Sequence, residues 1–79
     1  MVRTDVYVCV GGLPHEALLR TWVAHLPGLV QTRTFREGGR LTAFLTMRSE
    51  GEAAHAIEWV NTHLCGGHMC FAEHAYYNR

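Results

Sequence analysis

The sequence has no excess of charge of either sign, because seven Lys and Arg residues are matched by seven Asp and Glu residues. The broad positive field that favours nucleic-acid binding is therefore missing. No apolar run approaches the ~20 residues that span a bilayer, so we expect no membrane segment. Three cysteines are too few, and odd in number, for a disulfide framework. We expect reduced thiols and an intracellular location, with nucleus, cytoplasm and mitochondrion left open.

The sequence also lacks the residue groupings that small enzymes use. It shows no Ser-His-Asp arrangement, no paired carboxylates and no phosphate-binding loop. We therefore expect no catalytic site.

Histidines and cysteines are concentrated near the C-terminus, where Cys65 and His68 have a spacing that zinc sites use. Cys70 is expected to point into the core, whereas Cys65 and His68 should lie in the turn before the last strand. Ligands would have to converge from opposite sides of a sheet. We therefore expect no metal and no cofactor.

A chain of 79 residues holds one hydrophobic core, so we expect residues 1–79 to form a single domain. Alternation of apolar and polar residues predicts strands at 5–10, 40–47 and 69–75, and residues 30–36 are strand-like with an ambiguous phase. Apolar residues three and four positions apart predict helices at 15–26 and 49–64.

Local signals mark where the predicted elements begin and turn. Pro14 suits the first turn of the first helix, and Ser49 with Glu52 has the capping-box spacing at the start of the second. The segment 37–39, Glu-Gly-Gly, predicts a hairpin between the second and third strands. For the ambiguous second strand we favour the phase that turns Arg33 and Phe35 outward.

The predicted element order is βαββαβ, which is typical of an α+β, ferredoxin-like sandwich with two helices on one face of a four-stranded antiparallel sheet. The other sheet face is left to solvent, and function should be sought there. Trp22 lies on the apolar stripe of the first helix and is expected in the core. Trp59 lies beside the stripe of the second helix, and its assignment is left open, with a partly exposed partner contact as one alternative.

Residues 40–47, Arg-Leu-Thr-Ala-Phe-Leu-Thr-Met, follow half of the pattern K/R-G-F/Y-G/A-F-V-x-F/Y, since Arg40, Ala43 and Phe44 agree outright and Leu45 is a fair substitute for Val. That pattern is the third-strand motif of one family of domains, and residues 8–13 are similar to the short first-strand motif of that family. On these motifs the chain resembles the RNA-recognition motif (RRM) family over nearly its whole length. The resemblance implies the same fold and RNA binding through the open sheet face.

The three stacking positions of the family fall on Cys9, Thr42 and Phe44, of which only Phe44 is aromatic. Tyr7 precedes Cys9 by two residues on the same strand face and would offer a displaced stacking surface. The resemblance also implies a phosphate contact for Arg40. Further candidates for RNA contact are Arg33, Phe71 and Tyr77, with Phe35 as additional aromatic surface.

A base stacked on an aromatic ring contributes roughly 1–3 kcal/mol, so two bases supply about 2–6 of the ~8 kcal/mol that micromolar affinity requires. We therefore expect weak binding of single-stranded RNA with low base selectivity, within a larger RNA-processing or RNA-editing factor. The alternative is a protein-interaction module with a protein partner, which the neutral charge and the missing aromatics favour. A tail in which Tyr76 and Tyr77 cover Phe44 would also favour this alternative.

Overall fold

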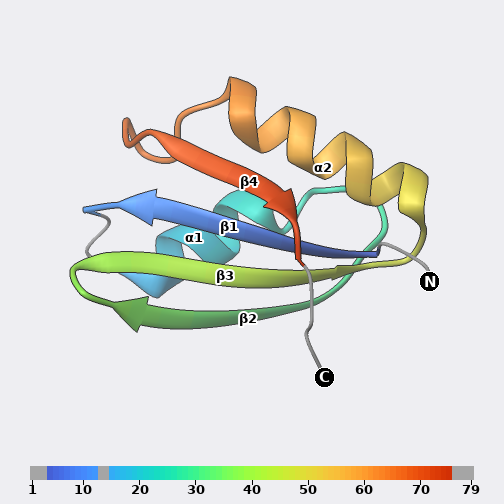
Figure 1. Cartoon of the computed structure of the whole chain (residues 1–79). Coiled ribbons are helices and arrows are strands. Elements are labelled where there is room, and N and C mark those ends of the chain that lie inside the picture. Colours follow the sequence, from blue (N-terminus) through green and yellow to red (C-terminus); the bar gives the residue numbers. More distant parts are fainter. Residues whose placement is uncertain (1–3, 13–14, 76–79) are drawn as a thin grey trace.

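Strands and helices follow one another in the order βαββαβ in the computed structural model, which describes residues 4–12 and 15–75. The elements are β1 (Asp5–Gly11), α1 (Glu16–Val23), β2 (Leu29–Glu37), β3 (Arg40–Met47), α2 (Glu50–Thr62) and β4 (Cys70–His74) (Figure 1). The expected α+β, ferredoxin-like fold is confirmed.

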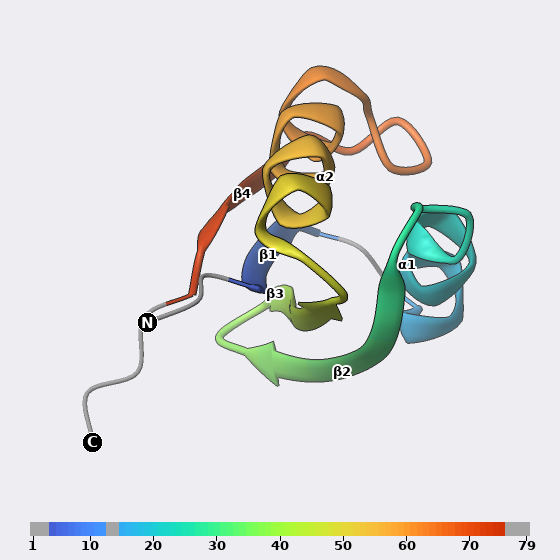
Figure 2. The same ribbon diagram turned by 90° about the vertical axis from the view of Figure 1, so that its right-hand side faces the viewer.

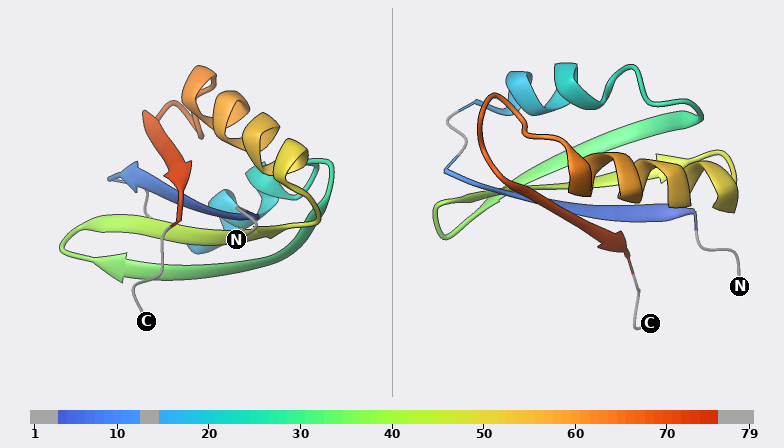
Figure 3. Two further views of the ribbon diagram at one scale, coloured as in Figure 1. Left: turned by 45° about the vertical axis from the view of Figure 1, so that its right-hand side comes forward. Right: turned by 90° about the horizontal axis from the view of Figure 1, so that it is seen from above.

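The four strands form one antiparallel sheet in the order β2-β3-β1-β4. Figure 2 shows both helices on the same side of this curved sheet. In Figure 3, α1 lies nearest β2 and α2 lies nearest β4. One sheet face is therefore covered by helices, and the other carries no secondary structure of the described residues.

The core lies between the helices and the covered sheet face. In β1 and β3 it is built from the alternate residues that the sequence turns inward, because successive side chains of a strand point to opposite faces of the sheet. The fully buried side chains include Val6, Val8 and Val10 of β1, Leu41, Ala43 and Leu45 of β3, Leu19 and Val23 of α1, and Ala53, Ala56 and Val60 of α2.

The hairpin between β2 and β3 is tight, since Glu37 and Arg40 are paired directly across it. The two residues between them, Gly38 and Gly39, have φ angles of 52° and 80°. Positive φ at both central positions is the requirement of the hairpin turn that matches the twist of the strands, and glycine adopts it without steric cost. The predicted hairpin is confirmed.

Side-chain hydrogen bonds fix both ends of α2. The Ser49 hydroxyl accepts from the backbone N–H of Glu52 at 3.2 Å, which confirms the predicted N-cap. Near the other end, Asn61 donates to the carbonyl of Ala72 at 3.0 Å and accepts from its N–H at 2.8 Å. Because β4 is an edge strand, Asn61 satisfies backbone groups that would otherwise be left unpaired.

The first helix is shorter than the sequence predicts. It ends at Val23, and Leu26 follows in a turn with its N–H bonded to the carbonyl of Val23 at 3.0 Å. The second helix likewise ends at Thr62. The prediction for Pro14 lies outside the described residues.

Trp22 is only partly buried, so its assignment to the core is wrong. Two helical turns present a narrow buried stripe, which Leu19 and Val23 fill. The larger Trp22 ring lies beside this stripe and packs against Trp59 of α2, with 4.8 Å between the ring centroids. Trp59, which the sequence left open, is partly exposed.

Contacts with α1 settle the phase of β2. Arg20 donates to the carbonyl of Thr32 at 3.1 Å and to the Thr34 hydroxyl at 3.3 Å. The Thr34 hydroxyl in turn donates to Glu16 at 2.8 Å. Thr34 therefore faces the helices. Its two neighbours in the strand, Arg33 and Phe35, face the open side, as expected.

Candidate nucleic-acid interface

The open face is organised as two rows of side chains that cross the sheet from β2 to β4. Residues paired directly across neighbouring strands point to the same face, so the strand register defines each row. The first row is Arg33, Phe44, Tyr7 and Glu73, and the second row is Phe35, Thr42, Cys9 and Phe71.

Two aromatic rings occupy the centre of the first row. Tyr7 and Phe44 are direct partners across β1 and β3, and their ring centroids lie 5.5 Å apart at an interplanar angle of 56°. Phe35 meets Phe44 from the second row, edge to face, at 5.7 Å. Such tilted contacts are favourable between aromatic rings. The aromatic surface thus includes the displaced position that the sequence assigned to Tyr7.

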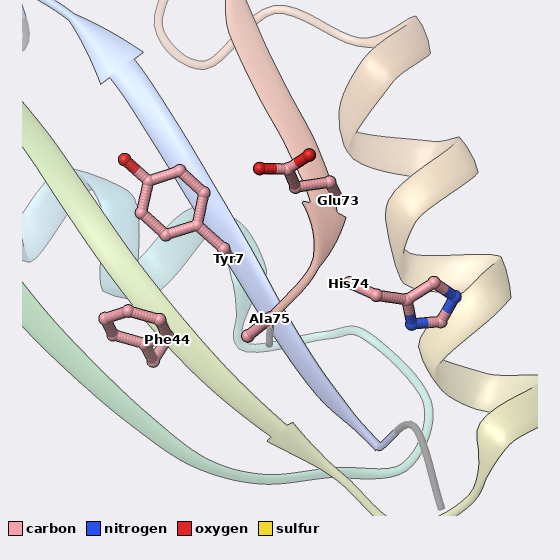
Figure 4. A pocket seen from close by; sticks show the side chains of 5 residues that line it. All are labelled: Tyr7, Phe44, Glu73, His74 and Ala75. Carbon is pink, nitrogen blue, oxygen red and sulfur yellow. The ribbon is translucent and has the colours of Figure 1, made fainter. Parts of the chain in front are cut away.

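A pocket of about 350 Å³ opens beside this ring pair. It is lined by Tyr7, Phe44, Glu73, His74 and Ala75 (Figure 4). In Figure 4 the rings of Tyr7 and Phe44 stand on one side and Glu73 on the other, whereas the ring of His74 is turned toward α2. The pocket therefore combines an apolar aromatic wall with a carboxylate.

Thr42 does not offer a contact surface, which corrects its assignment as an RNA-binding residue. Only 1% of Thr42 is exposed, and its hydroxyl donates to the carbonyl of Phe35 at 3.2 Å. It is a small side chain on a central strand, directly between Phe35 and Cys9 in the second row. Cys9, its partner in the second row, is half-buried.

The flanking aromatics are well exposed. Phe35 on β2 is 43% exposed and Phe71 on β4 is 52% exposed. They stand at the two ends of the second row, whose centre holds Thr42 and Cys9. The face therefore has aromatic surface at both edges as well as at the centre of the first row.

Charged groups lie around the aromatic surface. Arg33 is exposed at the β2 end of the first row, and Arg40 is exposed at the start of β3. Burial, with smaller contributions from Cys9 and Glu37, raises the pKa of Tyr7, while Arg40 lowers it. At neutral pH the Tyr7 phenol is therefore uncharged, and it is able both to stack and to donate a hydrogen bond.

Tyr77, the remaining sequence candidate, lies outside the described residues, as does Tyr76, so the alternative in which the tail covers Phe44 is not addressed by the described part of the chain. Glu73, His74 and Ala75 were not predicted as pocket residues. The alternation in β4 did turn Glu73 outward beside Phe71, but only the register of β1 with β4 places it opposite Tyr7. That register is a long-range property, which local periodicity does not contain.

The C-terminal thiols lie in the turn and strand where they were expected. Cys65 and His68 close a turn through backbone hydrogen bonds of 2.8 and 2.9 Å. The Cys65 side chain is fully buried, however, and burial and the neighbouring Cys70 thiol raise its pKa to about 11. Burial also raises the pKa of Cys70, which packs against the core. Both thiols therefore belong to the interior.

Two further properties hold for the part of the chain that the structure describes. No three His, Cys, Asp or Glu side chains of residues 4–12 and 15–75 are arranged to hold a metal ion. Neither helix in those ranges has the length and apolar character needed to cross a membrane.

The fold and the site define a class: a βαββαβ domain whose helix-free sheet face carries an aromatic pair and a pocket. Several solved structures are similar in shape to this chain. Pes4 RRM3 has a TM-score of 0.76 and 12% identity over 96% of this chain and 95% of that chain. RNA binding protein PG1 has a TM-score of 0.69 and 22% identity, with 96% and 98% covered. The MEC-8 C-terminal RRM domain bound to AGCACA has a TM-score of 0.68 and 17% identity, with 96% covered in both.

No protein-family model matches the sequence, and no curated protein matches it at the sequence level. The similarity is therefore one of structure, and at 11–22% identity it shows the fold. The chain has an RRM-like fold over nearly its full length, as the half-kept motif of β3 implied.

Proposed function

We propose that this chain is an RNA-binding domain that receives single-stranded RNA on the helix-free face of its sheet. The observation that carries the proposal is the Tyr7–Phe44 ring pair, with centroids 5.5 Å apart, which lines a pocket of about 350 Å³ on that face. Unpaired bases stack on aromatic side chains irrespective of sequence, because every base has a π-face. RNA-binding proteins of the same fold support the proposal.

In this proposal the residues of the sheet face contact different parts of the RNA. Tyr7 and Phe44 stack one or two bases, and Arg33 attracts the phosphates that approach from β2. Arg40 contributes a second phosphate contact from the start of β3. The exposed Phe35 and Phe71 supply further stacking surface at the sheet edges.

Affinity is expected to be low. Two stacked bases supply about 2–6 kcal/mol, against the ~8 kcal/mol that corresponds to a micromolar Kd. The chain has no net positive charge to make up the difference. We therefore place the domain within a larger intracellular RNA-processing or RNA-editing factor, in which other segments add affinity.

The test is a titration of the isotope-labelled chain with short single-stranded RNAs, followed through backbone amide shifts. Shifts are expected to cluster on β1 and β3, and Phe44→Ala should weaken binding about 5- to 150-fold, the equivalent of one lost stacking contact. Leu64→Ala is the matched control, because Leu64 is 58% exposed and lies after α2, away from the sheet face. Binding that is unaffected by Phe44→Ala would refute the proposal.

A protein-interaction module on the same scaffold is the second candidate. The equal numbers of acidic and basic residues favour it, as do the exposed rings of Phe35 and Phe71, because apolar surface with little charge is typical of protein interfaces. No amide shifts at high RNA concentration, or shifts confined to α1 and α2, would make this candidate the leading one.

A further inference from the structure

The pocket beside Tyr7 and Phe44 has one polar edge, and Glu73 forms it. Tyr7 is the central residue of this arrangement, with Phe44 directly opposite on β3 and Glu73 directly opposite on β4. Directly opposite side chains on one sheet face have Cβ atoms about 4.5–5.5 Å apart. A base stacked on the rings therefore has its edge within reach of the Glu73 carboxylate (Figure 4).

A carboxylate accepts hydrogen bonds and donates none, so it discriminates between bases by their donors. Guanine presents two neighbouring donors, N1–H and the N2 amino group, which match the two oxygens of a carboxylate. Adenine and cytosine each present one amino group next to a ring-nitrogen acceptor. Uracil presents a single N–H between two carbonyl oxygens, which a carboxylate repels. The chemistry of Glu73 thus favours guanine most and uracil least.

The charges along the first row give a bound nucleotide a direction. Arg33 stands at the β2 end of this row and Glu73 at the β4 end. A phosphate is attracted to the guanidinium and repelled by the carboxylate, whereas a donor-bearing base edge is attracted to the carboxylate. The sugar-phosphate chain is therefore directed toward β2 and the base edge toward β4.

We propose that the pocket formed by Tyr7, Phe44 and Glu73 is a guanine-selective subsite, in which Glu73 accepts hydrogen bonds from the N1–H and N2 amino groups of a stacked guanine. This inference rests on the proposed RNA-binding function and goes beyond the low base selectivity expected from the sequence. Glu73 is the specificity-determining residue, while the two rings supply sequence-tolerant stacking.

The experiment compares six-nucleotide RNAs of the form UUUXUU, where X is guanosine, inosine, adenosine, cytidine or uridine. The guanosine RNA should bind the wild-type chain about 5- to 20-fold more tightly than the uridine RNA, which lies in the lower half of the range for a bidentate base contact. Inosine keeps N1–H but lacks the N2 amino group, so it should bind with an affinity between the two. A ranking in which guanosine does not lead would overturn the proposal.

Variants separate selectivity from binding. Glu73→Gln keeps the shape of the side chain but replaces one acceptor with a donor, so the preference for guanosine over uridine should fall to within about twofold. Glu58→Gln on the exposed surface of α2 is the matched control and should leave the preference unchanged. If Glu73→Gln strengthens all five RNAs equally, Glu73 acts only by repelling phosphate, and the selectivity proposal is wrong.

The two proposals fail in different ways. Equal affinity for all five RNAs, with binding still weakened by Phe44→Ala, would reject guanine selection and leave the RNA-binding function standing. The absence of binding to every RNA would reject the RNA-binding function and the subsite together.

Discussion

Two groups of aromatic rings lie on opposite sides of the sheet. The sheet-face group is Tyr7, Phe35 and Phe44, and the helix-side group is Trp22, Trp59, His25 and His63. Ring centroids are 5.5–5.7 Å apart in the sheet-face group and 4.5–4.8 Å apart in the helix-side group. The helix-side rings are therefore the more closely packed.

The helix-side group is centred on one residue. Trp59 contacts Trp22 and His25 from the α1 side, and it stacks on His63 at an interplanar angle of 17°. Both tryptophans also pack against the core. Their rings therefore join two helices, whereas the rings of Tyr7 and Phe44 join two strands that backbone hydrogen bonds already hold together and border a pocket.

The position of a ring in this fold, more than its chemical type, determines what the ring contributes. A ring between elements with few other contacts stabilises the fold, because its removal opens a gap between them. A ring on the outer face of a hydrogen-bonded sheet contributes less to stability and offers its surface to a ligand. Each prediction below tests one side of this contrast.

Trp59→Ala is expected to have the largest effect. It should lower the free energy of unfolding by about 2–4 kcal/mol, somewhat less than for a fully buried tryptophan, since Trp59 is partly exposed. Urea unfolding followed by circular dichroism measures the loss. If the alanine variant does not fold, Trp59→Phe should show a smaller loss of the same sign. Leu64→Ala is the control and should change stability by less than about 0.5 kcal/mol.

Phe44→Ala should lower RNA affinity more than it lowers stability, unlike Trp59→Ala. RNA affinity is expected to fall by about 1–3 kcal/mol, because a stacking surface is removed. The free energy of unfolding should fall by only about 1 kcal/mol, which is typical for a cross-strand aromatic contact. Calorimetric titration and urea unfolding of the same preparation measure both quantities. A stability loss larger than that of Trp59→Ala would contradict the contrast between the two groups.

The interior on the helix side should respond to alkaline pH. Burial raises the pKa of Cys65 from 9.0 to about 11, so between these values the folded chain keeps a proton that the unfolded chain loses. The stabilisation is fully present below pH 9 and is lost as the pH rises to about 11. Urea unfolding at pH 8, 9.5 and 10.5 should show wild type losing its advantage over Cys65→Ala. If the difference in unfolding free energy between wild type and Cys65→Ala stays constant with pH, the raised pKa of Cys65 is contradicted. Pairing each measurement with Cys65→Ala cancels the contribution of Tyr7, whose pKa is raised as well.

The smallest expected effect concerns the edge of the sheet face. If Arg33 neutralises one phosphate of single-stranded RNA, Arg33→Ala should reduce the slope of log K against log salt by about 0.7. Affinities measured between low and moderate salt give the slope. Arg48→Ala, an exposed arginine between β3 and α2, is the charge-matched control and should leave the slope unchanged. Equal slopes for wild type and Arg33→Ala would show that Arg33 does not neutralise a phosphate of the bound RNA.

Much of the fold could be predicted because its signals are local. The alternation of Val6, Val8 and Val10 defines the buried side of β1, and Ser49 with Glu52 defines the start of α2. Two glycines define the hairpin between β2 and β3. Each of these signals acts within a few residues, where backbone sterics and hydrogen bonding are decided by the sequence itself.

The candidate site was predicted less completely. Tyr7, Phe44, Arg33 and Phe71 lie on the face where the alternation put them. Thr42 was assigned to the same face correctly, but its burial under its neighbours depends on their sizes and on strand register. The packing of Trp22 against Trp59 depends on how two helices meet, which periodicity within one helix does not describe.

The elements, their order and the outward side chains of β1, β3 and β4 follow from the local sequence, because backbone geometry over a few residues sets them. The position of Tyr7 between Phe44 and Glu73, the burial of Thr42 and the contact between the two tryptophans are set by the packed molecule as a whole. These neighbours are far apart in the chain. Their proximity comes from strand register and helix packing, which the whole core fixes together.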